Sequence, residues 1–170
     1  NHNHRGYIAI NTSTDVNSKL AEVKKPNQSE SFMIMREDTS ELPNVYLSGP
    51  NQWPALKGFK EVLENYTSQM TKLGRNLMRL ALISAGVKDL SIMQSFEIPT
   101  IWLRLLHYPS IPKNSPSDLY GSAPHTDFGC LTILVQDEIG GLQVQTKEGK
   151  WINVPKVEES FVVNVGDMLT

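Results

Sequence analysis

Residues 124–134 read PHTDFGCLTIL, and this stretch decides the fold. A loop ending in Pro124 runs through His125-Thr126-Asp127 into an apolar, β-branched run that predicts a strand over Leu131–Gln136. In extended backbone, residues i and i+2 project from the same side, so His125 and Asp127 are expected to converge. An imidazole nitrogen and a carboxylate oxygen suit Fe(II) and leave coordination positions open.

More short strands lie on both sides of this stretch. Glycine-containing turns separate the later ones, and a loop rich in Gly, Ser and Pro precedes His125. The predicted strands are Thr100–Tyr108, Leu142–Thr146, Trp151–Val154 and Phe161–Val165. Several short strands after a helical section predict a mainly β, α+β fold, in which a sandwich or jelly roll packs on helices.

The helical section lies between residues 55 and 85. Apolar residues recur there in steps of three and four, which is typical of an amphipathic helix with a buried stripe. Gly86 stands where a left-handed cap would end that helix, and a short second helix is predicted from Lys88 to Ser95. Residues 1–50 lack strong periodicity, so they predict an irregular arm with room for one short strand.

Composition limits the partners. The 170 residues are 39% hydrophobic and 20% charged, with a formal net charge of −2, so electrostatics gives no reason to expect nucleic acid or an anionic membrane. No apolar run approaches the roughly 20 residues that span a bilayer. The single cysteine, Cys130, excludes an internal disulfide framework and favours a reducing, cytoplasmic compartment.

A His-x-Asp triplet arises often by chance, but here it stands among other motifs in a fixed order. These are 103–109 (LRLLHYP), 124–129 (PHTDFG), 131–134 (LTIL), 140–144 (GGLQV), 149–151 (GKW) and 164–169 (NVGDML). Together they resemble the isopenicillin N synthase-like family of Fe(II)/2-oxoglutarate-dependent oxygenases.

The resemblance implies a double-stranded β-helix, or jelly roll, that is incomplete at the C-terminus. Residues 1–97 would form the N-terminal arm and support helices. Residues 98–170 would form the first part of the oxygenase core, within one structural domain. The implied activity is hydroxylation or desaturation of a small organic substrate with O2 and 2-oxoglutarate as co-substrates.

The resemblance also assigns site residues. Fe(II) would be held by His125, Asp127 and a distal histidine, and 2-oxoglutarate would chelate the metal. Its far carboxylate would be bound by Tyr108 and by a later Arg-x-Ser motif. The distal histidine is expected roughly 50–60 residues after His125, beyond Thr170, so the 170 residues alone are expected to show little turnover. Leu106 also departs from the family pattern, since many plant members carry Asn there.

Strand parity adds an expectation about Arg104. If Tyr108 faces the cavity, Arg104 and Leu106 share its face. The other face of the strand, with Ile101, Leu103, Leu105 and His107, is nearly all apolar and suits packing on the helix. An inward guanidinium needs an anionic or strongly polar partner. The hypothesis is that Arg104 contacts a carboxylate or carbonyl of the substrate, and the alternative is a structural ion pair.

Two further readings of the whole sequence stay open. One is an Fe(II) oxidase of the same family that uses no 2-oxoglutarate, as isopenicillin N synthase does. The other is a non-catalytic jelly-roll binding module in which His125 and Asp127 are vestigial. An Arg-x-Ser motif would favour the 2-oxoglutarate-dependent enzyme over the oxidase, and a metal titration would separate both enzymes from the binding module.

Overall fold

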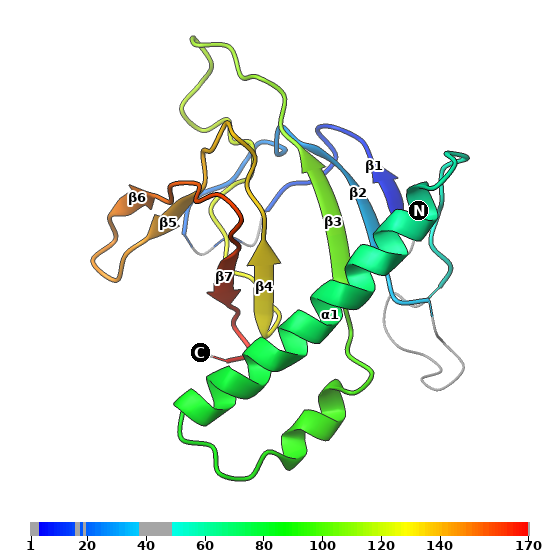
Figure 1. The fold of residues 1–170 in the computed structure, drawn as a ribbon. Coiled ribbons are helices and arrows are strands. Elements are labelled where there is room, and N and C mark those ends of the chain that lie inside the picture. The colour runs from blue at the N-terminus through cyan, green and yellow to red at the C-terminus, as the bar shows by residue number, and fades with distance from the viewer. Residues whose placement is uncertain (1–3, 16–17, 19, 38–48, 170) are drawn as a thin grey trace. The chain divides into compact units, whose positions relative to one another are not determined.

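The structure is a computed structural model that describes residues 4–15, 18, 20–37 and 49–169. The chain divides into two compact units, Asn1–His125 and Thr126–Thr170. Figure 1 labels α1 and the strands of both units. The first unit contains β1 (Gly6–Ile8), β2 (Glu30–Met35), α1 (Phe59–Ser84), the 3-10 helix η1 (Ser91–Phe96) and β3 (Trp102–His107). The second contains β4 (Leu131–Leu134), β5 (Gln143–Gln145), β6 (Trp151–Asn153) and β7 (Val162–Val165).

A three-stranded antiparallel sheet in the order β1-β2-β3 organises the first unit. The expected irregular arm therefore supplies two strands, and β2 is the central one. The sequence pattern failed here because β2 is covered on both faces: Phe32 contacts aromatic rings on one side, while Met33 and Met35 are buried on the other. A strand covered on both faces reads as a continuous apolar run and not as an alternation.

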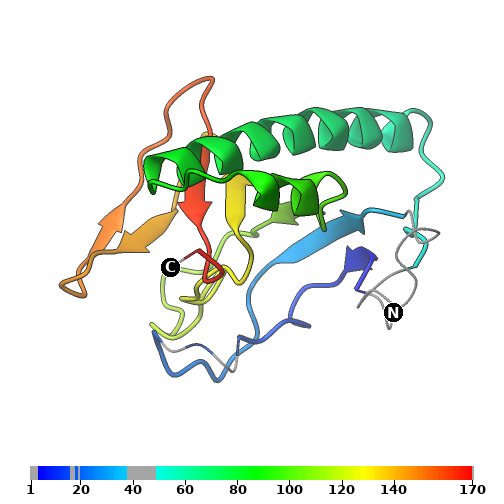
Figure 2. The same ribbon diagram turned by 90° about the horizontal axis from the view of Figure 1, so that it is seen from below.

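Helix α1 begins on one face of this sheet. The ring of Phe32 lies 5.2 Å from that of Phe59 and 6.3 Å from that of Trp53. Figure 2 shows α1 along one side of the sheet. Leu105 stands opposite Phe32 and Arg104 opposite Met33, and opposite residues share a face. The parity prediction is confirmed, because Leu105 faces the helix side and Arg104 the other.

Helix α1 ends just before Gly86, the glycine that the sequence predicts as its cap. Gly86 has a φ of 82°, its N–H donates to Ile83 O at 2.9 Å, and the N–H of Val87 donates to Leu82 O at 3.0 Å. These two bonds form a Schellman cap, which satisfies carbonyls that the last helical turn leaves open. The predicted second helix is instead the 3-10 helix η1. None of the helices in the described residues is long and apolar enough to cross a membrane.

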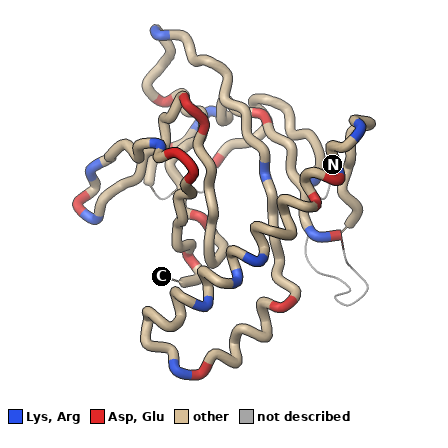
Figure 3. Tube along the Cα trace, viewed as in Figure 1, with Lys and Arg blue, Asp and Glu red and all other residues tan. Residues whose placement is uncertain are grey.

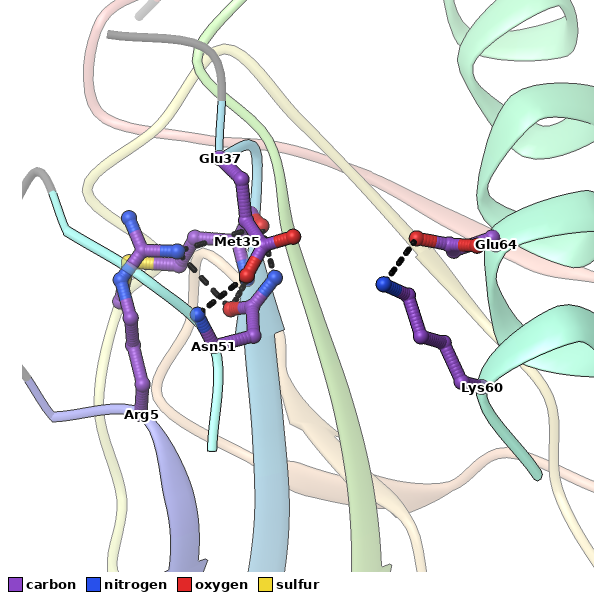
Figure 4. Close-up of polar contacts among 6 residues, drawn as sticks. All are labelled: Arg5, Met35, Glu37, Asn51, Lys60 and Glu64. Carbon is purple, nitrogen blue, oxygen red and sulfur yellow. Dashed lines mark hydrogen bonds and ion pairs between the residues drawn. The ribbon is translucent and has the colours of Figure 1, made fainter. Parts of the chain in front are cut away.

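Arg5 connects β1 to the end of β2 and to the segment that leads into α1 (Figure 4). Its side chain is 2% exposed, and its guanidinium donates to Met35 O at 3.2 Å and to Asn51 Oδ1 at 2.8 Å. Burial lowers the pKa of Arg5, and the charge of Glu37 opposes this. Asn51 also accepts from Met35 N–H at 3.0 Å and donates to Met35 O at 2.7 Å, so its amide satisfies both backbone groups of one residue.

Asn51→Ala is expected to lower the free energy of unfolding by about 2 kcal/mol, because it removes the acceptor of the Met35 N–H and one acceptor of the buried Arg5 guanidinium. Urea unfolding followed by circular dichroism measures this. Asn114→Ala is the matched control, because Asn114 is exposed in a loop. Equal midpoints for the two variants would contradict the structural role of Asn51.

The second unit consists of two antiparallel pairs, β4-β7 and β5-β6. All four strands lie where the sequence predicts them, each shorter by one or more residues than expected. A tight turn at Gly149, with a φ of 81°, joins β5 and β6. The described residues therefore form small antiparallel sheets with one long helix, which confirms a mainly β, α+β fold class.

Candidate metal centre

The loop before His125 is fixed by residues from the N-terminal arm. The N–H of Gln28 donates to Tyr120 O at 2.8 Å, and the N–H of Ala123 donates to Asn27 Oδ1 at 2.9 Å. Ala123 is 1% exposed, and Asn27 is itself buried. A buried amide that binds backbone holds its loop in one conformation, so the chain enters His125 from a fixed position.

The surroundings of His125 select one tautomer. Its Nδ1 lies 2.7 Å from the carbonyl oxygen of Ala123, and since a carbonyl only accepts, Nδ1 carries the proton. In that neutral tautomer, Nε2 carries the lone pair that binds a metal. A metal-binding histidine usually donates its other ring N–H to a backbone carbonyl or carboxylate in this way, which orients the ring.

Asp127 lies in the second unit, where the end of β7 contacts it. The side-chain amide of Asn164 donates to Asp127 Oδ2 at 3.1 Å, and the N–H of Asp167 donates to Asp127 O at 2.7 Å. Thr126 Oγ1 donates to Asp167 Oδ2 at 2.9 Å. The carboxylate and backbone of Asp127 are thus both held by residues 164–167.

These contacts add Asn164 and Asp167 to the candidate site, and neither residue is part of the His-x-Asp pattern. One signal was present, because Asn164 is a polar residue inside the apolar run FVVNV. His125 to Phe128 have no regular secondary structure, and the boundary between the two units follows His125. Among the described residues, no group of three or more His, Cys, Asp or Glu side chains stands ready to hold a metal.

Tyr108 follows β3 in the first unit and keeps its proton at neutral pH. Burial raises the pKa of Tyr108, while the charge of Arg104 and a hydrogen bond with Ser122 partly oppose the shift. Gly121 lies against its ring, where an added Cβ would be 3.1 Å from Tyr108 Cδ1. The hydroxyl is therefore a neutral donor, which suits a carboxylate ligand.

Arg104 is exposed, so the expectation of a buried guanidinium is wrong for this structure. Its Nε donates to Ser31 Oγ at 3.0 Å. Within the described part of the chain, no acidic side chain pairs with Arg104, so the alternative of a structural ion pair finds no support there. Parity placed Arg104 on the correct face but could not show whether another segment covers that face.

A basic hollow lies elsewhere in the first unit, between α1 and η1. It is lined by Lys72, Arg75, Asn76, Arg79, Leu90 and Met93. Figure 3 shows basic residues following one another along this part of α1, whereas both signs of charge are mixed along most of the trace. Neither His125 nor Asp127 lines the hollow, so it is a different feature from the candidate metal centre.

Comparison with known proteins identifies the family. The family model described as the 2OG-Fe(II) oxygenase superfamily matches residues 100–170, a range that contains Arg104, Tyr108, His125 and Asp127. The chain belongs to the 2OG-Fe(II) oxygenase superfamily. Residues 100–170 include β3 and every strand of the second unit, so the superfamily match rests on the strand-rich part of the chain.

Curated relatives carry names from the same superfamily. The 2-oxoglutarate-dependent dioxygenase caaD of Aspergillus niger is 37% identical over 171 residues, which cover 97% of this chain and 51% of that protein. The 2-oxoglutarate-Fe(II) type oxidoreductase hxnY of Emericella nidulans is 38% identical over 72% of this chain and 37% of that protein. The chain thus spans about half or less of these relatives' length.

Solved structures also resemble the chain. A full-length Neurospora crassa protein in complex with alpha-KG matches 97% of this chain and 53% of its own, with a TM-score of 0.77 and 34% identity. JOX2 in complex with 2OG, Fe and JA matches 98% of this chain and 46% of its own, with a TM-score of 0.72 and 27% identity.

Proposed function

We propose that the protein carrying this chain is an Fe(II)- and 2-oxoglutarate-dependent dioxygenase that hydroxylates or desaturates a small organic substrate. The observation that carries the proposal is the pair His125 and Asp127 within the superfamily match. Relatives that cover most of this chain are named as 2-oxoglutarate-dependent dioxygenases, which supports the same reaction class. Neither nucleic acid nor a membrane is proposed as a partner.

The residues present fit a ferrous ion. The proton on His125 Nδ1 leaves Nε2 as the donor atom, and the Asn164 amide contacts the Asp127 carboxylate without adding charge. One imidazole and one carboxylate are two of the three protein ligands of a facial triad. When bound, Fe(II) would supply the oxygen chemistry, with O2 as oxidant and 2-oxoglutarate as reductant. The task of His125 and Asp127 is to hold the ion in one position and to leave its other coordination positions open.

We further propose that residues 98–170 form the first part of a double-stranded β-helix and that residues 1–97 are its arm and supports. The small antiparallel sheets and the likeness to oxygenase structures support this fold. A cytoplasmic location remains a prediction from Cys130.

An anaerobic titration of the full-length protein with Fe(II) and 2-oxoglutarate tests the proposed function. Binding of both, followed by O2-dependent release of succinate and CO2, is the expected result. Iron binding with substrate oxidation but no use of 2-oxoglutarate would favour the oxidase of the same family. Absence of any specific metal binding would favour the non-catalytic binding module.

Tyr108 is proposed to bind the far carboxylate of 2-oxoglutarate. Tyr108→Phe keeps the ring against Gly121 but removes the donor, and a hydrogen bond to a charged group contributes about 1.5–3 kcal/mol. The KM for 2-oxoglutarate is therefore expected to rise about tenfold or more. Tyr120→Phe, which changes another tyrosine of the first unit, is the control. An unchanged KM in Tyr108→Phe would remove this role.

Arg104 is proposed to contact a carboxylate or carbonyl of the organic substrate. Its exposure and its single neutral partner among the described residues, the Ser31 hydroxyl, leave the positive charge uncompensated there. Arg104→Met in the full-length protein is expected to raise the substrate KM about tenfold or more, without a similar change for 2-oxoglutarate. An unchanged substrate KM would leave Arg104 as a partner of Ser31 alone.

A further inference from the structure

Asn164 stands at an unusual place in β7. It lies opposite Thr132 of β4, between Val163 and Val165, which are both exposed and belong to the other face of the strand pair. Its own side chain is half-buried, and its amide nitrogen lies 3.1 Å from Asp127 Oδ2. The polar residue of this strand is therefore directed at the proposed metal ligand.

The chemistry of the amide suits that contact. A carboxylate bound only through its backbone can rotate about its last side-chain bond, and each rotation changes the direction of its lone pairs. A hydrogen bond from an amide N–H fixes that rotation. The amide is neutral, so it does not compensate the negative charge that a cation needs, as a lysine or arginine in the same place would.

We propose that Asn164 is a positioning residue that orients the Asp127 carboxylate for metal binding. This rests on the proposed function, in which Asp127 binds iron. Asn164 acts through Asp127 and touches neither iron nor substrate in this proposal. Partners that orient metal ligands commonly change metal affinity by about 10–100-fold when they are removed.

The backbone around Asp127 has its own supports, which makes the role of the amide separable from folding. Asp167 N–H donates to Asp127 O at 2.7 Å, and Thr126 Oγ1 donates to Asp167 Oδ2 at 2.9 Å. Neither bond uses the side chain of Asn164. Removing the amide should therefore take away one hydrogen bond that orients the carboxylate, while the loop stays attached to the end of β7.

The test is an anaerobic Co(II) titration of the full-length protein, read from the absorption of the bound metal, with no substrate present. Asn164→Leu, which keeps the size but removes the donor, is expected to raise the Kd for Co(II) about tenfold or more. Asn153→Leu is the matched control, because Asn153 is also a strand asparagine of the second unit with a side-chain amide contact, to Gln143 at 2.9 Å. Its Kd should equal that of the unchanged protein.

A double-mutant cycle identifies the route of the effect. In an Asp127→Ala background, Asn164→Leu should weaken Co(II) binding no further, because the carboxylate that it orients is gone. Independent, additive losses would overturn the proposal, and so would an unchanged Kd in Asn164→Leu alone. If the unchanged protein binds no Co(II) or Fe(II) at all, Asp127 is no metal ligand and the proposed function fails first.

Thermal unfolding of the metal-free protein excludes a merely structural explanation. If Asn164 only stabilises the fold, Asn164→Leu should lower the Tm of the metal-free protein, and its Kd for Co(II) should stay within threefold of the unchanged value. That pattern would overturn the positioning role. A raised Kd in a variant that remains folded at the titration temperature supports it.

Discussion

Alanine at His125 or Asp127 is expected to abolish metal-dependent turnover of 2-oxoglutarate in the full-length protein. Each substitution removes one of the two Fe(II) ligands that are proposed within this chain. A correctly held metal contributes several kcal/mol to such a reaction, so the loss should reach about a thousandfold or more. The measurements are succinate formation under O2 and Fe(II) affinity under anaerobic conditions, and both should fall together.

The controls are another histidine and another aspartate. His107 pairs with Glu30 on the sheet of the first unit, with 2.8 Å between His107 Nδ1 and Glu30 Oε1. Asp137 accepts the N–H of Ile139 at 2.9 Å in an exposed turn. His107→Ala and Asp137→Ala should keep metal affinity and turnover within about threefold of the values for the unchanged protein. That change is smaller than the tenfold that corresponds to about 1.36 kcal/mol. Retained turnover in His125→Ala or Asp127→Ala would refute the assignment of the ligands.

The fold was predictable wherever its signal is local. The long helix and the short strands of the second unit are specified by residues close together in the sequence. One example is the row of apolar residues, three and four positions apart, that stops before Gly86. Strand β2 depends on distant partners, since it pairs with β3 along its whole length and Phe32 packs on the start of α1. Because both faces of β2 are covered, its sequence lacks the alternation of apolar and polar residues that marks a half-buried strand.

The same distinction applies to the candidate site. His125 and Asp127 stand two positions apart, so their pattern is visible in one short stretch. Asn164 contacts Asp127 only because β7 pairs with β4, and the two residues are 37 positions apart in the chain. Arg104 shows a third case, in which strand parity gives the face of a side chain but not its exposure, because exposure depends on which other segments cover that face.

Gly166 offers a second large expected effect, because its Cα approaches the backbone of the Asp127 loop. A Cβ added there would overlap the carbonyl oxygen of Gly129 and lie 2.8 Å from the carbonyl oxygen of Asp127. Even close C···O contacts in proteins stay near about 3.3 Å. Both obstacles are backbone atoms, so no side-chain rotation relieves them. The turn must therefore separate from the loop before an alanine fits.

Gly166→Ala is accordingly expected to lower the free energy of unfolding by about 3 kcal/mol, at the upper end of overpacking effects. The loss includes bonds that this approach permits, from Gly166 N–H to Cys130 O at 2.9 Å and from Asp167 N–H to Asp127 O at 2.7 Å. Because Asp127 would move with its carbonyl, metal affinity should fall as well. Urea unfolding and a Co(II) titration measure the two effects.

Gly129→Ala is the matched control on the other side of the contact. No heavy atom lies within 4 Å of a Cβ added to Gly129, so the methyl group meets open space. Its unfolding midpoint should stay close to that of the unchanged protein, within the about 0.5 kcal/mol typical of surface substitutions. Equal stability and equal Co(II) affinity for the two alanine variants would mean that the turn after β7 does not hold the Asp127 loop. In that case the orientation of Asp127 would have to come from its own loop.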